Sequence, residues 1–294
     1  SVGLIPATRG IDAVLDGHAH HVLDLRLPNA DGDSIPLLST GTAGQYLGRL
    51  TIHPKGTISH ELLTTQSLPS APRMQSVLDD IEQRLNAAIN RKVGYNEQAL
   101  SDKDAEGNRL VRNHETALAD FISDAFRSVL HTQIGLIHGG GIRATLSQGD
   151  ITIGQLATVS PFNNMAARVS ATGQQIMDAL EVSVARYPAE NGDFHIFSGL
   201  RYTIDPSIPS PVIWDANNMF TGVGGTRRVI AVEVQDTLTG TWSAIDPQAT
   251  YSIGGEDYVL LNQGASGMFK CAKPMPCELL KDIEVLSLYI HSMG

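Results

Sequence analysis

The sequence predicts an α+β fold, in which helices and strands follow one another without regular alternation. Apolar residues recur at helical spacing over residues 116–130, a pattern typical of a helix with one buried face. Short strand-like runs occur later in the chain, at residues 194–204, 229–234 and 251–253. Because these elements do not alternate strand by helix, they favour a mixed arrangement over a doubly wound parallel sheet.

Length and composition describe a globular protein. A chain of 294 residues can hold one large domain or one domain with fragments. It contains no run of about 18 apolar residues, so no transmembrane segment is predicted. No signal peptide is predicted either, because no basic segment followed by an apolar one begins the chain. The net charge of −10 argues against a nucleic-acid polymer as a partner, since DNA and RNA attract basic faces.

Residues 1–66 have the character of strands and turns. Candidate strands lie at residues 10–16, 34–41, 47–53 and 58–63. A proline-containing joint follows between Leu68 and Pro72, and helices avoid crossing such a joint. Beyond it, apolar residues at helical spacing predict a helix that ends near Arg91: Met74, Val77, Leu78, Ile81, Leu85, Ala88 and Ile89. We interpret this helix as a linker between two domains.

The rest of the chain contains further predicted helices and a glycine turn. Residues 135–143, GLIHGGGIR, have the form of a short strand that runs into a turn. Thr172 followed by Gln175 is a capping-box pattern, which predicts the start of a helix. The last predicted helix covers residues 277–292.

The stretch LDGHAHH places His18 and His20 directly after a predicted strand. If the backbone stays extended past Gly17, both side chains project to the same side, because side chains alternate along a strand. Two imidazoles placed in this way can share one zinc or manganese ion. A polar turn that contains three histidines, His21 included, explains the pattern equally well, since hydrolytic metals need at least three protein ligands.

The loop His138-Gly139-Gly140-Gly141-Ile142-Arg143 points to anion binding. Successive glycines let a backbone approach a ligand closely and turn its N–H groups toward an anion. The guanidinium of Arg143 suits a phosphate or a carboxylate. Arg112 strengthens this interpretation, because it precedes a predicted helix N-terminus, which itself favours anions. The alternative is a structural turn with a solvated arginine.

Two aromatic residues stand beside polar turns. Phe162 lies in SPFNN at residues 160–164, and Tyr258 follows a strand and a double glycine in GGEDYVLL. Two rings that face each other across a gap can stack a flat base, at about 1–3 kcal/mol per base. Taken singly, each ring is better explained by packing in the core or at its rim.

The two cysteines, Cys271 and Cys277, allow two interpretations. A closely spaced pair in a proline-containing loop can form a disulfide, which would indicate an oxidising compartment. Two free thiols fit the same spacing. The pair is not a CxxC motif and has no second pair, so a structural zinc site is not expected.

Taken in order, these motifs resemble the 5′-nucleotidase family. GIDAVLDGHAHH is similar to the last metal motif of the family's metallophosphoesterase domain. The motifs that are similar to its C-terminal substrate-binding domain are RNHETALADFISDAFR, GLIHGGGIRATLSQGDITIGQL, SPFNN and FHIFSGLRYTID. The resemblance covers nearly the whole chain, and the combination of GGGIR, GDIT and PFNN in this spacing is specific.

The resemblance implies a domain organisation. Residues 1–66 would be the C-terminal remnant of a metallophosphoesterase domain, residues 67–92 the linker helix, and residues 93–294 the substrate-binding domain, a mixed sheet with helices. The family's other metal ligands lie upstream of the GHxH motif and have no match here. We therefore expect the chain to be a fragment that is inactive alone, with its metal site incomplete or absent.

The resemblance also implies an activity. The family's enzymes are periplasmic, secreted or at the cell surface, and they use two divalent metal ions, such as zinc or manganese, to hydrolyse nucleoside monophosphates. The expected partner is a nucleotide or nucleoside. Alternatives are a 2′,3′-cyclic-nucleotide phosphodiesterase/3′-nucleotidase or a UDP-sugar hydrolase of the same family. A non-catalytic nucleotide-binding module is the alternative from another class.

Residue by residue, the resemblance implies a substrate site and two metal ligands. The substrate-binding residues would be Arg112, His138, Gly140, Gly141, Arg143, Phe162, Asn164 and Tyr258, and the metal ligands His18 and His20. The two arginines would hold the phosphate. The two aromatic rings would stack the base, with the asparagine near it. No catalytic residue is assigned within this chain.

The sequence departs from the family's pattern in two places. The family often has asparagine where this chain has His138, which alters a polar contact to the base. The family's GGDG(F/Y) loop carries an aspartate for the ribose hydroxyls, whereas residues 263–267 read QGASG. A substrate without ribose, or with ribose held differently, is therefore allowed.

Overall fold

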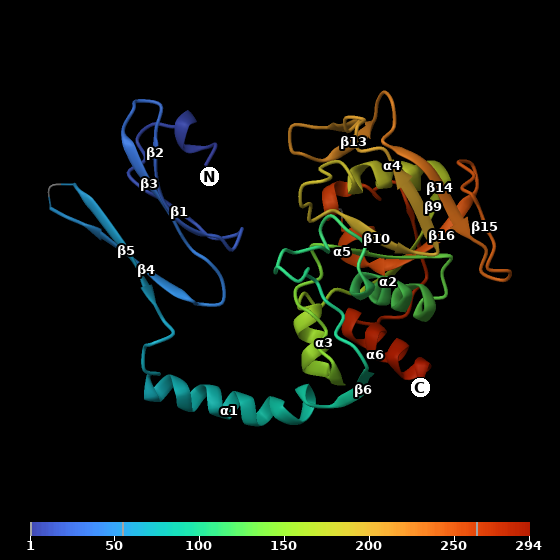
Figure 1. The fold of residues 1–294 in the computed structure, drawn as a ribbon, viewed down its shortest axis with the longest axis horizontal. Helices are drawn as coiled ribbons and strands as arrows, with labels where there is room; N and C mark the ends of the chain where they lie inside the picture. The colour runs from blue at the N-terminus through green and yellow to red at the C-terminus, as the bar shows by residue number, and fades with distance from the viewer. Residues whose placement is uncertain (1, 55, 263) are drawn as a thin grey trace. The chain divides into compact units, whose positions relative to one another are not determined.

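The structure, a computed structural model, describes residues 2–54, 56–262 and 264–294. It confirms the α+β class, with two compact units at residues 1–82 and 83–294 (Figure 1). None of the described helices is long and apolar enough to cross a membrane.

The first unit is built from short sheets. A three-stranded sheet has the order β1-β3-β2, with β1 parallel and β2 antiparallel to β3, and β4 pairs with β5. The elements are η1 (Ile5–Ala7), β1 (Val14–Asp16), β2 (Val22–Pro28), β3 (Ser34–Thr40), β4 (Tyr46–Ile52) and β5 (Ile58–Thr64). Its buried cluster contains only Ile5, Ile35 and Leu37 among the described residues. The predicted strand at 10–16 is shorter than expected, and β2 was not predicted as a separate strand.

The helix predicted after the proline-containing joint is present as α1 (Pro72–Ile89), and its role as a linker stays a prediction. Its predicted apolar stripe does not form part of a core in this structure. Met74, Val77 and Leu78 are exposed, as are the later members of the stripe.

The second unit is organised around a five-stranded sheet of order β10-β7-β16-β9-β17, in which β7 and β16 are parallel and the other pairs antiparallel. The strands are β7 (Ile134–His138), β9 (Ala166–Thr172), β10 (His195–Ser198), β16 (Thr250–Glu256) and β17 (Lys273–Met275). Helix α2 (Ala117–Val129) packs against β7, β10 and β16, whereas α4 (Gly173–Ser183) packs against β9 and against β14 (Val229–Gln235) (Figure 1).

Smaller elements surround this sheet. A second sheet has the order β11-β14-β15, and β12 pairs with β13 and β6 with β8. The remaining elements are β6 (Lys92–Asn96), β8 (Gly149–Thr152), α3 (Ile153–Val159), β11 (Leu200–Ile204), β12 (Val212–Trp214), β13 (Phe220–Val223), β14 (Val229–Gln235), β15 (Trp242–Ala244), α5 (Asp257–Leu260), η2 (Ala265–Gly267) and α6 (Asp282–Met293).

Local sequence explains where the predicted helices begin. The Thr116 side chain accepts a hydrogen bond from the Ala119 amide at the start of α2, which satisfies one of the helix's free N–H groups. Thr172 and Gln175 form the predicted capping box at α4. The buried stripe of α2, with Leu118 and Phe126 among its members, confirms the predicted amphipathic face.

Two predicted elements have different bounds. The run at 194–204 is two strands, because Gly199 has a φ of +74° and breaks it. The last helix begins at Asp282 rather than at residue 277. Its preceding residues instead pair with the chain near β9, where the Ala166 amide donates to the Leu280 carbonyl at 2.8 Å.

Candidate functional site

The glycine turn after β7 is shaped by close backbone contacts. A Cβ on Gly139 would lie 2.0 Å from the Val111 carbonyl oxygen and 3.1 Å from the Arg112 Cα atom. Only glycine allows this approach. The approach brings residues 111–112, distant in sequence from the turn, against it.

The amides of the turn do not have the role that the sequence suggested. The Gly139 amide donates to the Phe194 carbonyl at 2.7 Å, and the Gly140 amide to the Gly192 carbonyl at 2.9 Å. The Gly141 amide donates to His138 of the same turn at 2.9 Å. The prediction that these three N–H groups face an anion is therefore wrong, because backbone carbonyls already use them.

Positive charge at the turn comes from side chains. Burial, followed by the charges of Arg109 and Arg143, lowers the pKa of Arg112 from its usual value. The Arg112 Nε atom is buried, and no described residue forms a hydrogen bond with it. Arg109 forms an ion pair with Glu190, and the Glu190 carboxylate partly offsets these positive charges at Arg112. The guanidinium groups of Arg112 and Arg143 lie close enough to repel each other, an arrangement that an anion would relieve.

Phe162 lies beside Arg143. The Arg143 Cζ atom is 5.7 Å from the centroid of the Phe162 ring, within the range of a cation–π contact. The Arg143 amide donates to the Val159 carbonyl at the end of α3, so the helix end positions the arginine. The Phe162 side chain is 53% exposed, which leaves its ring available to a ligand.

The turn that carries Phe162 is held in place by the buried carboxylate of Asp282. This carboxylate is 1% exposed, and it accepts hydrogen bonds from the Ser160 hydroxyl at 2.8 Å and the Asn164 amide at 3.2 Å. Burial raises the pKa of Asp282 above its usual value. Asn164 thus takes part in this contact through its backbone amide.

Tyr258 and His138 form a second aromatic contact at the turn. Their ring centroids are 5.2 Å apart with planes inclined by 32°. Tyr258 is 43% exposed, and a Cβ on Gly264 would lie 2.6 Å from its ring. The phenol ring therefore lies between Gly264 and the imidazole of His138, and part of it remains exposed to solvent.

A buried carboxylate stands behind His138. Glu256 ends β16 and His138 ends β7, and because the two strands are parallel neighbours, their carboxyl ends lie at the same edge of the sheet. The Nδ1 atom of His138 is 2.9 Å from Oε2 of Glu256, although the oxygen lies off the line along which Nδ1 would donate. Glu256 is 1% exposed, and neither of its oxygens accepts a hydrogen bond from a described residue.

His195 on β10 completes this group of rings. Its centroid is 6.1 Å from that of His138. Burial, followed by the nearby His138, lowers the pKa of His195 to about 3. His195 is therefore neutral at physiological pH, and it offers no positive charge to Glu256.

The sequence did not identify Glu256, His195 or Asp193 as parts of the site. The Ser266 hydroxyl donates to the Asp193 carboxylate, which brings an acid from a separate segment to the QGASG loop. Gln263 of that loop lies outside the described residues. Nothing in the sequence signals this pairing, because the two residues are 73 positions apart.

The backbone at His18 and His20 differs from the extended conformation that the sequence analysis assumed. The His20 amide donates to the Gly17 carbonyl at 3.3 Å, and His20 has a φ of +59°. The backbone therefore turns after Gly17 instead of continuing as a strand, so the premise for placing both side chains on one side fails. Within residues 2–54, 56–262 and 264–294, no group of three or more His, Cys, Asp or Glu residues could hold a metal ion.

The two cysteines are free thiols in the structure. Cys271 is exposed, whereas the Cys277 thiol lies 3.7 Å from the Ala166 carbonyl oxygen and donates to it. Burial raises the pKa of Cys277. The disulfide interpretation is thus not the arrangement found here.

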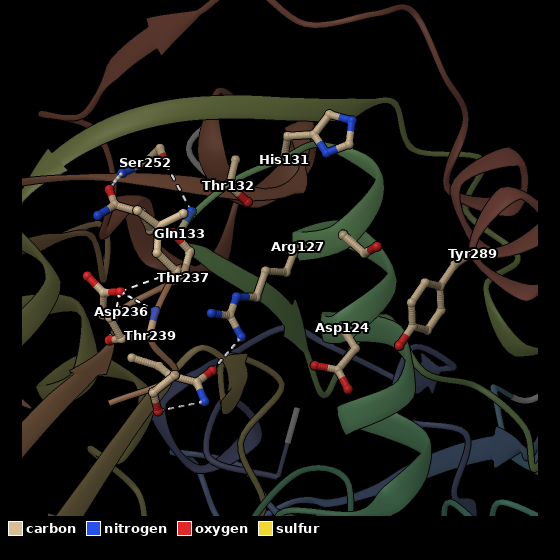
Figure 2. Close-up of a pocket in the computed structure, with 14 residues that line it drawn as sticks. Asp124, Arg127, His131, Thr132, Gln133, Asp236, Thr237, Thr239, Ser252 and Tyr289 are labelled. Carbon is tan, nitrogen blue, oxygen red and sulfur yellow. Dashed lines mark hydrogen bonds between the residues drawn. The ribbon is translucent and has the colours of Figure 1, made fainter. Parts of the chain in front are cut away.

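A cleft of about 880 Å³ lies elsewhere in the second unit, between α2, α6 and the loop after β14. Figure 2 shows Asp124 and Arg127 projecting from α2 toward it, with Tyr289 on its other side. Arg127 is engaged by Gln235 at 3.0 Å, and none of the predicted site residues lines the cleft. We place the candidate site at the glycine turn and not in this cleft, because Arg112, Arg143 and the exposed rings of Phe162 and Tyr258 lie at the turn.

Comparisons with known proteins show which family the second unit belongs to. The family described as "5'-nucleotidase, C-terminal domain" matches residues 94–273, which include the whole glycine turn. The chain is 28% identical over 285 residues to a trifunctional nucleotide phosphoesterase of Bacillus subtilis, covering 90% of this chain and 18% of that protein. It is 26% identical over 233 residues to the 5'-nucleotidase of Homo sapiens, covering 68% and 40%.

Solved structures extend the comparison. The 5'-nucleotidase precursor from Thermus thermophilus superposes with a TM-score of 0.78 at 25% identity, covering 99% of this chain and 58% of that one. The sulfate thiohydrolase SoxB of Thermus thermophilus shares the fold, with a TM-score of 0.67 at 20% identity and coverage of 100% and 50%. The chain thus spans between 18% and 58% of the length of these relatives.

Proposed function

Because this chain belongs to the 5′-nucleotidase C-terminal domain family, we propose that it is the substrate-binding part of an enzyme that removes phosphate from nucleoside monophosphates. One observation carries the proposal. At one edge of the main sheet, the structure gathers the mutually repelling Arg112 and Arg143 with the exposed rings of Phe162 and Tyr258. Such a group has the chemistry to hold a phosphate at one end and a flat base at the other.

Each part of the ligand has a counterpart in this group. The two guanidinium groups favour the dianionic phosphate, and the rings stack the base. Gly140 and Gly141 contribute no side chains, and this lets the turn pack closely against the His138 ring. A Cβ on Gly141 would lie 2.9 Å from that ring. The loop at residues 263–267 lacks the family's aspartate. Asp193, which accepts a hydrogen bond from the Ser266 hydroxyl, is the acid that would bind the ribose hydroxyls in its place.

Hydrolysis of the phosphate ester is not assigned to residues of this chain. The family resemblance implies two divalent metal ions, but the described residues contain no group of three or more His, Cys, Asp or Glu residues that could hold one. We therefore derive no chemical step within this chain and propose binding as its role. The exposed strands and small core of residues 1–66 support their proposed origin in a larger metallophosphoesterase domain, with residues 67–92 as the linker and residues 93–294 as the binding domain.

The location of the protein is also a proposal. One relative, from Listeria monocytogenes, is a cell wall protein that is 26% identical over 211 residues. This similarity supports an exported enzyme, as the family resemblance implies.

Calorimetric titration of the 294-residue chain with a nucleoside monophosphate tests the proposed binding function. We expect saturable binding at one site that weakens as salt is added, because the arginines are attracted to the phosphate through partly screened charges. Inorganic phosphate should compete at high concentration. A chain that binds neither nucleotides nor nucleosides would contradict the proposal.

A further inference from the structure

A pocket of about 280 Å³ lies at β10, the edge strand of the main sheet in the second unit. The arginines and exposed rings of the proposed nucleotide site do not line it, whereas His195 is common to both places. Apolar cavities with a few polar groups are typical sites for small molecules. Aromatic rings from separate segments of the chain line this one: His114, Tyr187, Phe194, His195, Phe197 and Tyr202.

The rings of this pocket meet at steep angles. The ring centroids of Phe197 and Tyr202 are 6.3 Å apart, and their planes are inclined by 87°. His114 and Tyr187 form a similar pair, with centroids 6.4 Å apart and an angle of 64°. In such pairs one ring turns its face toward the edge of the other, so the pocket has aromatic walls of different orientation. Phe197, Tyr202 and Tyr187 are half-buried, which leaves part of each residue accessible.

A carboxylate lies beside these rings. Glu115 is exposed and lines the pocket, and no residue in the described part of the chain forms a hydrogen bond or an ion pair with its carboxylate. Its charge acts on the lining, because burial raises the pKa of Tyr202 to about 12 and the charge of Glu115 adds to this rise. The faces of the aromatic rings carry partial negative charge as well. The pocket therefore attracts a cation more strongly than an anion.

Arg201 does not neutralise this negative charge. It is the only lysine or arginine among the described residues that line the pocket. Its guanidinium pairs with Glu233 at 2.8 Å, and its Cζ atom lies 4.5 Å from the ring centroid of Trp242. Burial, followed by the nearby His138, lowers the pKa of His195 to about 3, so this ring is neutral at physiological pH. A cation that enters the pocket would thus meet aromatic rings and a carboxylate that has no partner.

We propose that this pocket is a second ligand site, which binds a small quaternary ammonium compound through its aromatic rings, with Glu115 as the counter-charge. A methylated quaternary nitrogen has no N–H groups that need acceptors, and the faces of aromatic rings attract it within about 6 Å. Metal cations instead need several oxygen ligands, which a lining of rings does not supply. The volume of about 280 Å³ suits a free molecule of the size of choline. The inference goes beyond the proposed nucleotide binding and does not depend on it.

Choline and 3,3-dimethylbutan-1-ol are matched probes for this site, because they have the same shape and differ in a charged nitrogen against a neutral carbon. In titrations of the unmodified chain followed by ligand-observed NMR, we expect choline to bind about tenfold more tightly than the alcohol. Tetramethylammonium should displace choline, whereas a nucleoside monophosphate should not. Vesicles of phosphatidylcholine should not retain the chain, since the proposed ligand is a free molecule.

Two substitutions separate the contributions of the rings and the carboxylate. Phe197→Leu keeps an apolar side chain but removes one aromatic face, so it should reduce the preference for choline over the alcohol by about threefold. Glu115→Gln should weaken choline binding by a similar factor and leave the alcohol unaffected, because only choline is charged. Glu278→Gln is the matched control, since Glu278 is an exposed acid that does not line the pocket, and it should change neither affinity.

Each contrary result overturns a stated part of the inference. Equal binding of the two probes, or no binding of choline by a chain that binds nucleotides, would overturn the cation site and leave the nucleotide site standing. Displacement of choline by a nucleoside monophosphate would assign the pocket to the nucleotide site, and retention on vesicles would assign it to a lipid headgroup. The comparison of the two probes in the unmodified chain decides the matter even where Phe197→Leu does not fold.

Discussion

Replacement of Arg143 by alanine separates phosphate recognition from recognition of the nucleoside. In the structure this guanidinium makes one long hydrogen bond, 3.4 Å to the Gly140 carbonyl, and a cation–π contact with Phe162. Its removal should therefore lower the free energy of unfolding by no more than about 1 kcal/mol. A charge-assisted hydrogen bond to phosphate, in contrast, contributes about 1.5–3 kcal/mol.

That difference translates into a selective loss of affinity. The dissociation constant of a nucleoside monophosphate should rise by about 10- to 150-fold, since 1.4 kcal/mol corresponds to a factor of ten. The dissociation constant of the matching nucleoside should change by less than about threefold, because it lacks the phosphate. Calorimetric titration of both ligands into the same protein preparation measures the two effects together.

A matched control comes from Arg201, which stacks on Trp242 at 4.5 Å and pairs with Glu233. Arg201→Ala removes the same charge and a similar aromatic contact away from the glycine turn, so it should leave both affinities nearly unchanged. Equal losses for nucleotide and nucleoside in Arg143→Ala would show that the arginine supports the fold instead. The reasoning would fail equally if the control lost affinity to the same extent.

Three further perturbations have distinct expected results. Phe162→Ala should weaken nucleoside and nucleotide binding alike, by about 1–3 kcal/mol in a calorimetric titration; a loss confined to the nucleotide would contradict base stacking. Burial, reinforced by neighbouring carboxylates, raises the pKa of Asp120 to about 6, so the folded state holds a proton that the unfolded chain releases near pH 4, and stability falls as pH rises from about 4 to 6. Asp120→Asn should flatten this slope in urea unfolding and stabilise the protein at pH 7 by about 1–2 kcal/mol after solvent screening; an unchanged slope would exclude Asp120 as its source. In timed alkylation followed by mass spectrometry, Cys271 should react faster than Cys277, whose pKa is raised by burial; resistance of both without reductant would indicate a disulfide.

The fold was predictable where local sequence determines local structure. The helix at 116–130 and the helix after Thr172 begin at capping residues and carry a regular apolar face, so periodicity and caps located both. The last helix was placed too early, because residues before Asp282 are drawn into contact with the chain near Ala166. Such long-range pairing leaves no local pattern in the sequence.

In the candidate site, too, sequence motifs identified individual residues but not their long-range partners. Motifs pointed to Arg112 and Arg143, and the structure places the two close enough for their charges to interact. The partners that give the site its chemistry were not visible, since Glu256 meets His138 only through the pairing of two parallel strands. The extended backbone assumed for residues 18–20 is absent for a local reason: His20 has a left-handed φ, which a histidine-rich stretch does not reveal.

The measurement that tests the account most directly is a crystal structure of the chain with a bound nucleoside monophosphate. We predict that the base stacks against Phe162 and Tyr258, that the phosphate lies within hydrogen-bonding distance of Arg143, and that the ribose hydroxyls face Asp193. A nucleotide bound instead in the cleft beside Arg127, or with its phosphate away from the glycine turn, would contradict the account.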